Sequence, residues 1–98
     1  MTTVATSKSF FKYAKRLSID RQEEVVAAIS GFMQDPTAAR FNLEKVKNRT
    51  GYWTIRSSYG DRILLRQTDL ADPAPVPDAF EAIAVGNHDL IYKTYFRK

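Results

Sequence analysis

A histidine, a tyrosine and an arginine in the second half of the chain could act together on a phosphodiester. His88 and Tyr92 are four residues apart, and Arg62 begins an earlier apolar segment. Histidine exchanges a proton near neutral pH, and arginine stabilises negative charge that grows on a phosphate. Each residue also has a structural interpretation: His88 as a cap, Tyr92 as core, and Arg62 as the partner of Asp61 or Asp89. Spacing alone leaves both interpretations open.

The charge distribution supports an anionic partner. Residues 40–66 carry seven Lys or Arg against two Asp or Glu, whereas residues 67–91 carry five acidic residues and no basic one. Residues 92–98 add three more basic side chains. A basic block of this kind favours a nucleic acid as partner. The alternative is the solvated surface of an ordinary basic protein.

The composition excludes several other classes of protein. The chain has 98 residues, no cysteine and one histidine, so disulfide frameworks, thiol catalysis and the usual zinc ligand sets are impossible. We therefore expect no metal site, and the acid–base chemistry described above needs no cofactor. No apolar run is long enough to span a bilayer, and the first residues do not resemble a secretory signal. We expect a single cytoplasmic domain over residues 1–98 with no membrane contact.

The first part of the chain predicts two helices. Ser7 or Ser9 can cap a short first helix, and Asp20 can cap a second one. The second helix must end near Asp35, because Pro36 disfavours helical geometry in the residue before it. The short connection between the two helices predicts an antiparallel hairpin.

The period then changes to that of strands. Residues 52–56 and 62–67 alternate as strands joined by a turn over 57–61, and the nearly all-apolar residues 80–85 predict a central strand. Residues 69–78 contain three prolines and predict an exposed loop, and residues 88–95 predict a short helix that Asn87 can cap. A weak first strand around residue 4 is left open.

These elements predict an α+β domain. An N-terminal helical hairpin would pack on a small, mainly antiparallel sheet, with a short C-terminal helix. The expected core is formed by apolar residues from every element: Phe10, Leu17, Val25, Ile29, Phe32, Trp53, Ile55, Ile63, Leu65, Ile83 and Val85.

Two sequence blocks resemble the RelE/ParE toxin superfamily of bacterial toxin–antitoxin modules. One is Gly51–Arg56 followed by Arg62; the other is Val85–Tyr92, which is similar to that family's closing V-G-x-H/R-x-x-x-Y element. The resemblance extends from about residue 7 to residue 92. It implies a small sheet packed by two N-terminal helices, and a cognate antitoxin that holds the protein inactive.

The resemblance also implies roles for single residues. Arg62 matches the family's strand arginine that contacts the scissile phosphate, and His88 matches the position of a catalytic arginine or histidine. Tyr92 matches the C-terminal tyrosine. Some members carry two lysines on the strand where this chain has Tyr52 and Thr54.

Further roles follow from the same resemblance. Some members use a glutamate as general base, and Glu44 is the carboxylate available for it, with Tyr92 or a lysine as rivals. The remaining predicted contacts with RNA are basic residues of the middle block: Lys45, Lys47, Arg49, Arg56 and Arg66.

The resulting prediction is a metal-independent endoribonuclease toxin that cuts mRNA in the ribosomal A site. Its partners would be the ribosome, mRNA and an antitoxin with which it forms a hetero-oligomer. One alternative is a DNA gyrase inhibitor of the ParE type, which would not need His88. Another is an inactive relative that only binds its antitoxin and operator DNA.

Overall fold

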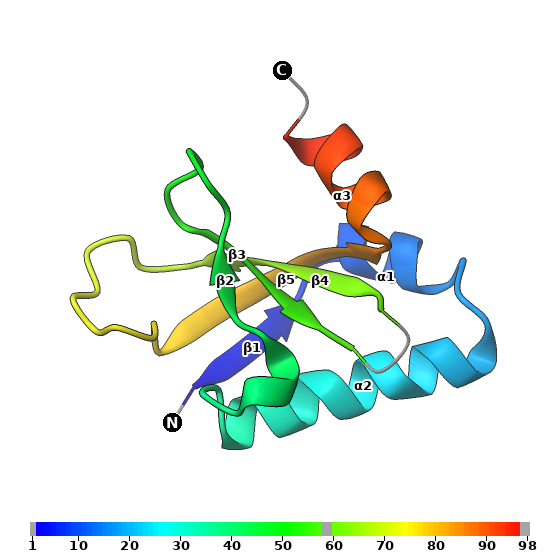
Figure 1. Cartoon of the computed structure of the whole chain (residues 1–98), viewed down its shortest axis with the longest axis horizontal. Helices are drawn as coiled ribbons and strands as arrows, with labels where there is room; N and C mark the ends of the chain where they lie inside the picture. The colour runs from blue at the N-terminus through cyan, green and yellow to red at the C-terminus, as the bar shows by residue number, and fades with distance from the viewer. Residues whose placement is uncertain (1, 58–59, 97–98) are drawn as a thin grey trace.

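The computed structural model describes residues 2–57 and 60–96. These residues form three helices and five strands, so the α+β class is confirmed (Figure 1). In chain order the elements are β1 (Thr3–Thr6), α1 (Lys8–Ala14), α2 (Ile19–Gln34), the 3₁₀ turn η1 (Ala39–Phe41), β2 (Glu44–Lys45), β3 (Tyr52–Arg56), β4 (Arg62–Gln67), β5 (Ala79–Gly86) and α3 (His88–Tyr95).

The strands form one sheet in the order β1-β5-β4-β3-β2. The β1–β5 pair is parallel and the other three pairs are antiparallel, which confirms the mainly antiparallel sheet. β5 lies inside the sheet, as its apolar sequence predicts. The register between β4 and β5 shifts at Leu64/Leu65, so Ile83 has no direct partner on β4.

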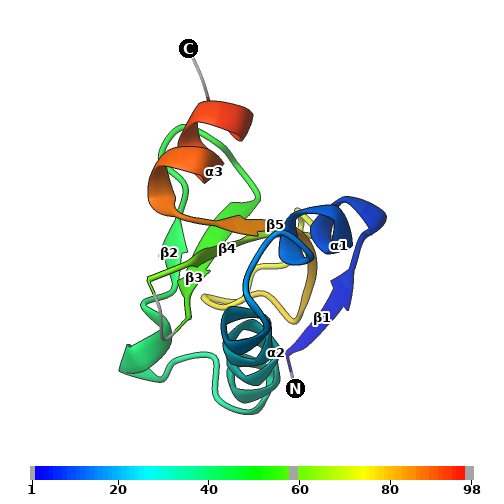
Figure 2. The ribbon, with the colours of Figure 1, turned by 90° about the vertical axis from the view of Figure 1, so that its right-hand side faces the viewer.

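The sheet separates two apolar layers. Figure 2 shows α2 below the sheet and α3 above it. The α2 side contains the larger core cluster, which includes every predicted core residue except Ile83. Ile83 is half-buried and packs with the smaller cluster under α3, around Leu64, Ala84 and Ile91. The prediction omitted Phe41 and Phe80, which also belong to the larger cluster.

The predicted helical hairpin is not confirmed, because α1 packs chiefly against the edge of β5. β1 ends at Thr6, and beyond it the Ser7 N–H donates to the Ala82 carbonyl at 3.1 Å. The Ser9 hydroxyl donates to the Ile83 carbonyl at 2.7 Å. α1 therefore continues the coverage of β5 that β1 begins.

The predicted helix caps are confirmed for α1, at Ser7, and for α3, whereas the cap of α2 differs. α2 is capped by Ser18, whose hydroxyl accepts from the Arg21 N–H, so the prediction of Asp20 as cap was wrong. Asp20 instead lies in the first turn, where its charge favours the helix dipole. The predicted cap Asn87 of α3 is confirmed by its bond to the Leu90 N–H at 2.7 Å.

Two predicted segments lie partly outside the described residues. The turn over 57–61 includes residues 58 and 59, and the basic tail includes Arg97 and Lys98. The Ser57 N–H donates to the Asp61 carbonyl at 2.9 Å, which joins the two ends of this turn. Within residues 2–57 and 60–96, no helix is long and apolar enough to cross a membrane.

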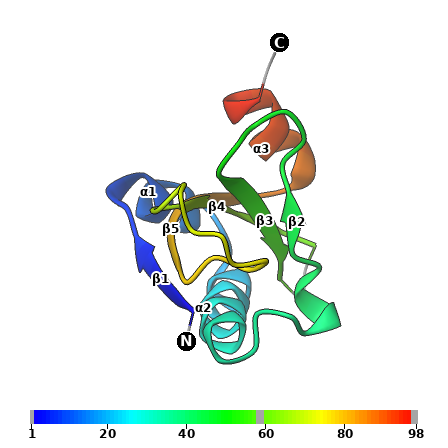
Figure 3. The same ribbon diagram turned by 90° about the vertical axis from the view of Figure 1, so that its left-hand side faces the viewer.

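The proline-containing loop over 69–78 is fixed by its own contacts. The Asp72 carboxylate accepts hydrogen bonds from the backbone N–H groups of Ala74 and Asp78, at 2.9 and 3.0 Å, and Pro77 is buried. Figure 3 shows this loop on the same side of the molecule as the turn between β2 and β3. The two segments line one cleft of about 480 Å³.

Candidate functional site

Strand pairing brings Arg56, Arg62 and the start of α3 to one end of the sheet. Arg62 is the register partner of Arg56 on β3 and of Gly86 on β5. His88 begins α3 two residues after Gly86. Residues from three separate segments of the sequence thus meet at the same edge.

The two arginines at this edge have no acidic partner. Like charges directly opposite each other on neighbouring strands are destabilising. No carboxylate of the described residues lies within 4.0 Å of the Arg56 or Arg62 guanidinium. Asp61 pairs with Arg21, and Asp89 lies 3.7 Å from the Nδ1 atom of His88, so neither neutralises Arg62. The edge is therefore suited to an anion.

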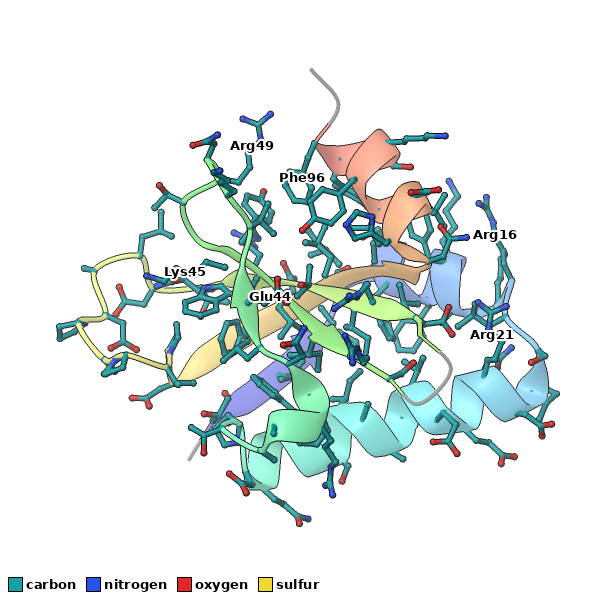
Figure 4. The ribbon with its side chains drawn as sticks, in the orientation of Figure 1. Arg16, Arg21, Glu44, Lys45, Arg49 and Phe96 are labelled. Atoms are coloured by element: carbon teal, nitrogen blue, oxygen red, sulfur yellow. The ribbon has the colours of Figure 1, made fainter. Side chains whose placement is uncertain are left out.

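His88 is accessible and held by an aromatic neighbour. Its side chain is 62% exposed, and its ring stacks on Tyr92 with centroids 4.3 Å apart and planes at 22°. The ring centroids of Tyr92 and Phe96 are 5.5 Å apart, and those of Phe96 and Tyr52 of β3 are 5.7 Å apart. A row of aromatic rings therefore extends along α3 to the sheet (Figure 4).

Glu44 does not lie beside His88. Glu44 is exposed on the edge strand β2, opposite Thr54, and accepts a hydrogen bond from the Asn42 amide. Two strands separate β2 from β5, which places their backbones about 14 Å apart at the usual spacing. Of the predicted bases, Tyr92 is the one that contacts His88.

Arg66 is at the other end of β4 and is already paired. Its guanidinium lies 2.6 Å from the Glu81 carboxylate on β5. The hydrogen bond with Glu81, and then its charge, raise the pKa of Arg66. The separation of four residues from Arg62 corresponds to about 13 Å along the strand.

The basic residues upstream of β3 are also dispersed. Lys45 pairs in register with Trp53, and its Nζ lies 5.4 Å from the Trp53 ring centroid. Because strand side chains alternate, Lys45 faces away from Glu44 and borders the cleft beside loop 69–78 (Figure 4). Lys47 is exposed in the following turn, and the Arg49 guanidinium lies 5.9 Å from the Phe96 ring.

Two structural contacts behind the site have no signal in the local sequence. The buried Asp61, directly before Arg62, binds Arg21 of α2, 40 residues earlier. Tyr95, the last residue of α3, packs against the smaller core cluster, and its hydroxyl lies 3.5 Å from the Ile83 carbonyl. Burial, together with Tyr13, raises the pKa of Tyr95 to about 12, so this phenol stays protonated.

The arrangement as a whole can bind and polarise a phosphate group. Two unpaired guanidinium groups stabilise negative charge, and an accessible imidazole can transfer a proton. No group of three or more His, Cys, Asp or Glu side chains that could hold a metal ion occurs within residues 2–57 and 60–96.

No protein-family model matches the sequence. No curated protein matches it either. Solved structures do match it over nearly the whole chain. A chain of the RelB–RelE antitoxin–toxin complex from Methanococcus jannaschii aligns with a TM-score of 0.66 and 16% identity, over 93% of this chain and 98% of that one.

Two Escherichia coli structures give similar values. A chain of the intact RelBE toxin–antitoxin complex aligns with a TM-score of 0.61 and 15% identity, over 89% of this chain and 96% of that one. The isolated RelE toxin aligns with a TM-score of 0.60 and 15% identity, over 99% and 98% of the two chains. The comparison of structures thus agrees with the resemblance seen in the sequence, and the chain has the fold of the RelE toxins.

Proposed function

We propose that this protein is the toxin of a type II toxin–antitoxin module and that it cuts mRNA in the ribosomal A site. The observation that carries the proposal is the register pair Arg56–Arg62. Neither guanidinium has a carboxylate of the described residues within 4.0 Å, and the pair lies at the end of the sheet from which the exposed His88 begins α3. The RelE fold supports the same assignment, because the matching structures include toxin–antitoxin complexes.

The proposed reaction uses the nucleophile that RNA carries. The 2′-hydroxyl oxygen attacks the neighbouring phosphorus, and the bond from phosphorus to the 5′-oxygen breaks. Arg62 and Arg56 stabilise the charge of the crowded intermediate, and protonated His88 donates its proton to the leaving 5′-oxygen. The products are a 2′,3′-cyclic phosphate and a 5′-hydroxyl. Tyr92 stacks on the imidazole and is the predicted base that contacts His88; as a phenolate it would accept the 2′-hydroxyl proton and become the neutral phenol.

The ribosome supplies what this site lacks. One histidine cannot serve as both acid and base in the same step, and Glu44 is distant from β5. Alignment of the reacting oxygens can contribute many powers of ten in rate. A ribosome that holds the A-site codon in the reactive geometry would provide this alignment, so we expect free RNA to be cut poorly.

The proposed antitoxin is an acidic or amphipathic segment that folds on this domain in the cytoplasm and forms a hetero-oligomer with it. The basic residues of 40–66 would attract it. Added salt should therefore slow association more than it speeds dissociation. Association rates that do not change with salt would contradict electrostatic attraction of the antitoxin.

The proposal is tested by inducing the protein and its His88→Ala and Arg62→Ala variants in cells. The wild type should stop translation and leave cut mRNA, whereas both variants should lose toxicity and keep a folded circular-dichroism spectrum. Arg16→Gln is the matched control, because Arg16 is exposed on the segment after α1 and should leave toxicity unchanged. If the His88→Ala variant stays fully toxic, His88 is not the general acid. DNA damage without cut mRNA would favour the gyrase alternative.

Cleavage is then compared on one RNA, free and in a programmed ribosome, at equal protein concentration. Cleavage of the ribosome-bound RNA alone is the expected result. Equal cleavage of both would show that the protein carries a complete active site, which contradicts the proposed need for the ribosome.

A further inference from the structure

A cavity of about 250 Å³ opens where α2, η1 and the end of β3 meet. Its polar lining consists of Glu24, Arg40, Arg56 and Ser57, and the rest is apolar. At about 30 Å³ for a water molecule in the liquid, the cavity has room for several water-sized groups. The cavity shares Arg56 with the proposed nuclease site, whereas Arg62, His88 and Tyr92 do not line it.

Ser57 brings an unused hydroxyl to this cavity. The residue is 4% exposed, and its Oγ has no hydrogen-bond partner among the described residues. The backbone of Ser57 is satisfied, because its N–H donates to Asp61 and its carbonyl accepts from Gly60. Buried hydroxyl groups are almost always hydrogen-bonded. The Ser57 hydroxyl can therefore donate a hydrogen bond to a ligand that enters the cavity.

Arg40 is held in place at the same cavity. Its guanidinium lies over the Phe41 ring at 4.7 Å from the centroid. Its Nη2 atom lies 2.9 Å from the point that a β carbon at Gly31 would occupy. The lack of a side chain at Gly31 therefore makes room for this guanidinium, and Arg40 needs little reordering to bind a ligand.

The charge of the lining favours an anion. Arg40 and Arg56 contribute two positive charges against the one carboxylate of Glu24. Neither arginine has a carboxylate of the described residues within 4.0 Å. Tetrahedral oxyanions accept several hydrogen bonds at once, and arginine is well matched to phosphate.

We propose that this cavity is a phosphate-binding site, in which Arg40 and Arg56 supply charge and the Ser57 hydroxyl donates a hydrogen bond. Arg56 is the register partner of Arg62, so the site adjoins the edge that carries Arg62 and His88. The phosphate belongs either to an RNA strand that continues past this edge or to a free phosphate compound. The RNA source rests on the proposed function, whereas phosphate binding itself does not.

The site is tested by NMR of the full chain, following backbone amide and arginine Nε–Hε signals. The first titration uses inorganic phosphate, with sodium chloride at matched ionic strength as its control. The second uses a short oligoribonucleotide whose 2′-hydroxyl groups are methylated, so that it cannot be cut. We expect saturable shifts around Ser57 and at two arginine side chains, and none of this pattern with chloride.

The variants should change the affinity in opposite directions. Ser57→Ala should weaken phosphate binding about tenfold, the size of one hydrogen bond to a charged acceptor. Glu24→Gln removes the opposing carboxylate and should tighten binding. Arg40→Gln should also weaken phosphate binding, so the site can still be tested if Ser57→Ala changes the fold. Arg16→Gln is the control and should leave the phosphate affinity unchanged.

The outcomes separate this site from the proposed nuclease. Tighter binding of the oligoribonucleotide than of phosphate would support the RNA source, and binding of phosphate alone would support the free compound. His88→Ala should bind phosphate like the wild type, so a non-toxic protein can still carry the site. Unchanged affinity in both Ser57→Ala and Arg40→Gln, or shifts that only follow ionic strength, would overturn the proposal.

Discussion

The ion pair between Arg21 and Asp61 should show a marked asymmetry when each partner is removed. The Asp61 side chain is 2% exposed, whereas that of Arg21 is 39% exposed. Both carboxylate oxygens accept hydrogen bonds from Arg21, one of them from Nε at 2.9 Å. The pair joins α2 to the residue directly before Arg62.

The two single variants leave different groups behind. Removing one partner of a buried ion pair costs about 3–5 kcal/mol, because the other charge stays buried and unpaired. Water reaches Arg21, so we reduce this figure and expect Arg21→Gln to cost about 2–3 kcal/mol. Asp61→Asn leaves only Arg21, which can turn into water, and should cost about 1 kcal/mol. Against a total stability of about 5–15 kcal/mol, this difference is measurable.

Equilibrium unfolding in urea measures these free energies, with the fluorescence of the buried Trp53 and circular dichroism as two probes. Arg16→Gln is again the control, because its exposed guanidinium lies over the Tyr13 ring at 5.6 Å from the centroid and this contact should contribute less than about 1 kcal/mol. The double variant of Arg21 and Asp61 should be more stable than Arg21→Gln alone. If Asp61→Asn costs as much as Arg21→Gln, the buried carboxylate is not the origin of the cost, and the reasoning fails.

Other consequences of the structure can be tested in the same protein. Gly51→Ala should lower the free energy of unfolding by about 1–3 kcal/mol in urea titrations, because Gly51 has φ +86° and a β carbon would collide with Leu70. Asn87→Ala removes the cap of α3 and should cost about 1 kcal/mol, with faster amide exchange in α3. Backbone hydrogen bonds from Ala74 and a second amide of its loop hold the pKa of Asp72 below its usual range. Their stabilisation of the loop is present above the unfolded pKa of about 4 and is lost as the pH falls through the lower native pKa. The Ala74 amide signal should therefore move in acid, and should not do so in Asp72→Asn.

The elements and the core could be predicted because their signals are local. The alternation in 52–56 and 62–67, the apolar run of 80–85 and the cap at Asn87 each depend on a few neighbouring residues. Local signals were insufficient where two choices were chemically similar. Ser18 and Asp20 both have side chains that cap helices well. The extended backbone conformation at Ser18 makes Ser18 the cap.

Long-range arrangements could not be obtained in this way. The two-residue strand β2 is too short to show a period, and its pairing decides that Glu44 and Lys45 face opposite sides of the sheet. The partner of Asp61 lies 40 residues away, so sequence could not exclude a pair with Arg62. The roles of Arg62 and His88 remain predictions. The pairing of β4 with β5 brings Arg62 and the start of α3 to one end of the sheet.

The pairing of β1 with β5 has a consequence for how the protein is made. Ser7, directly after β1, bonds to the carbonyl of Ala82, 75 residues later. Closing a contact over so long a segment costs chain entropy, and contacts of this kind slow folding. During synthesis β1 is made well before its partner strand, because Thr3–Thr6 precede Ala79–Gly86 in the chain. The sheet, and with it the end that carries Arg62 and His88, cannot form until β5 has been made and can pair with both β1 and β4.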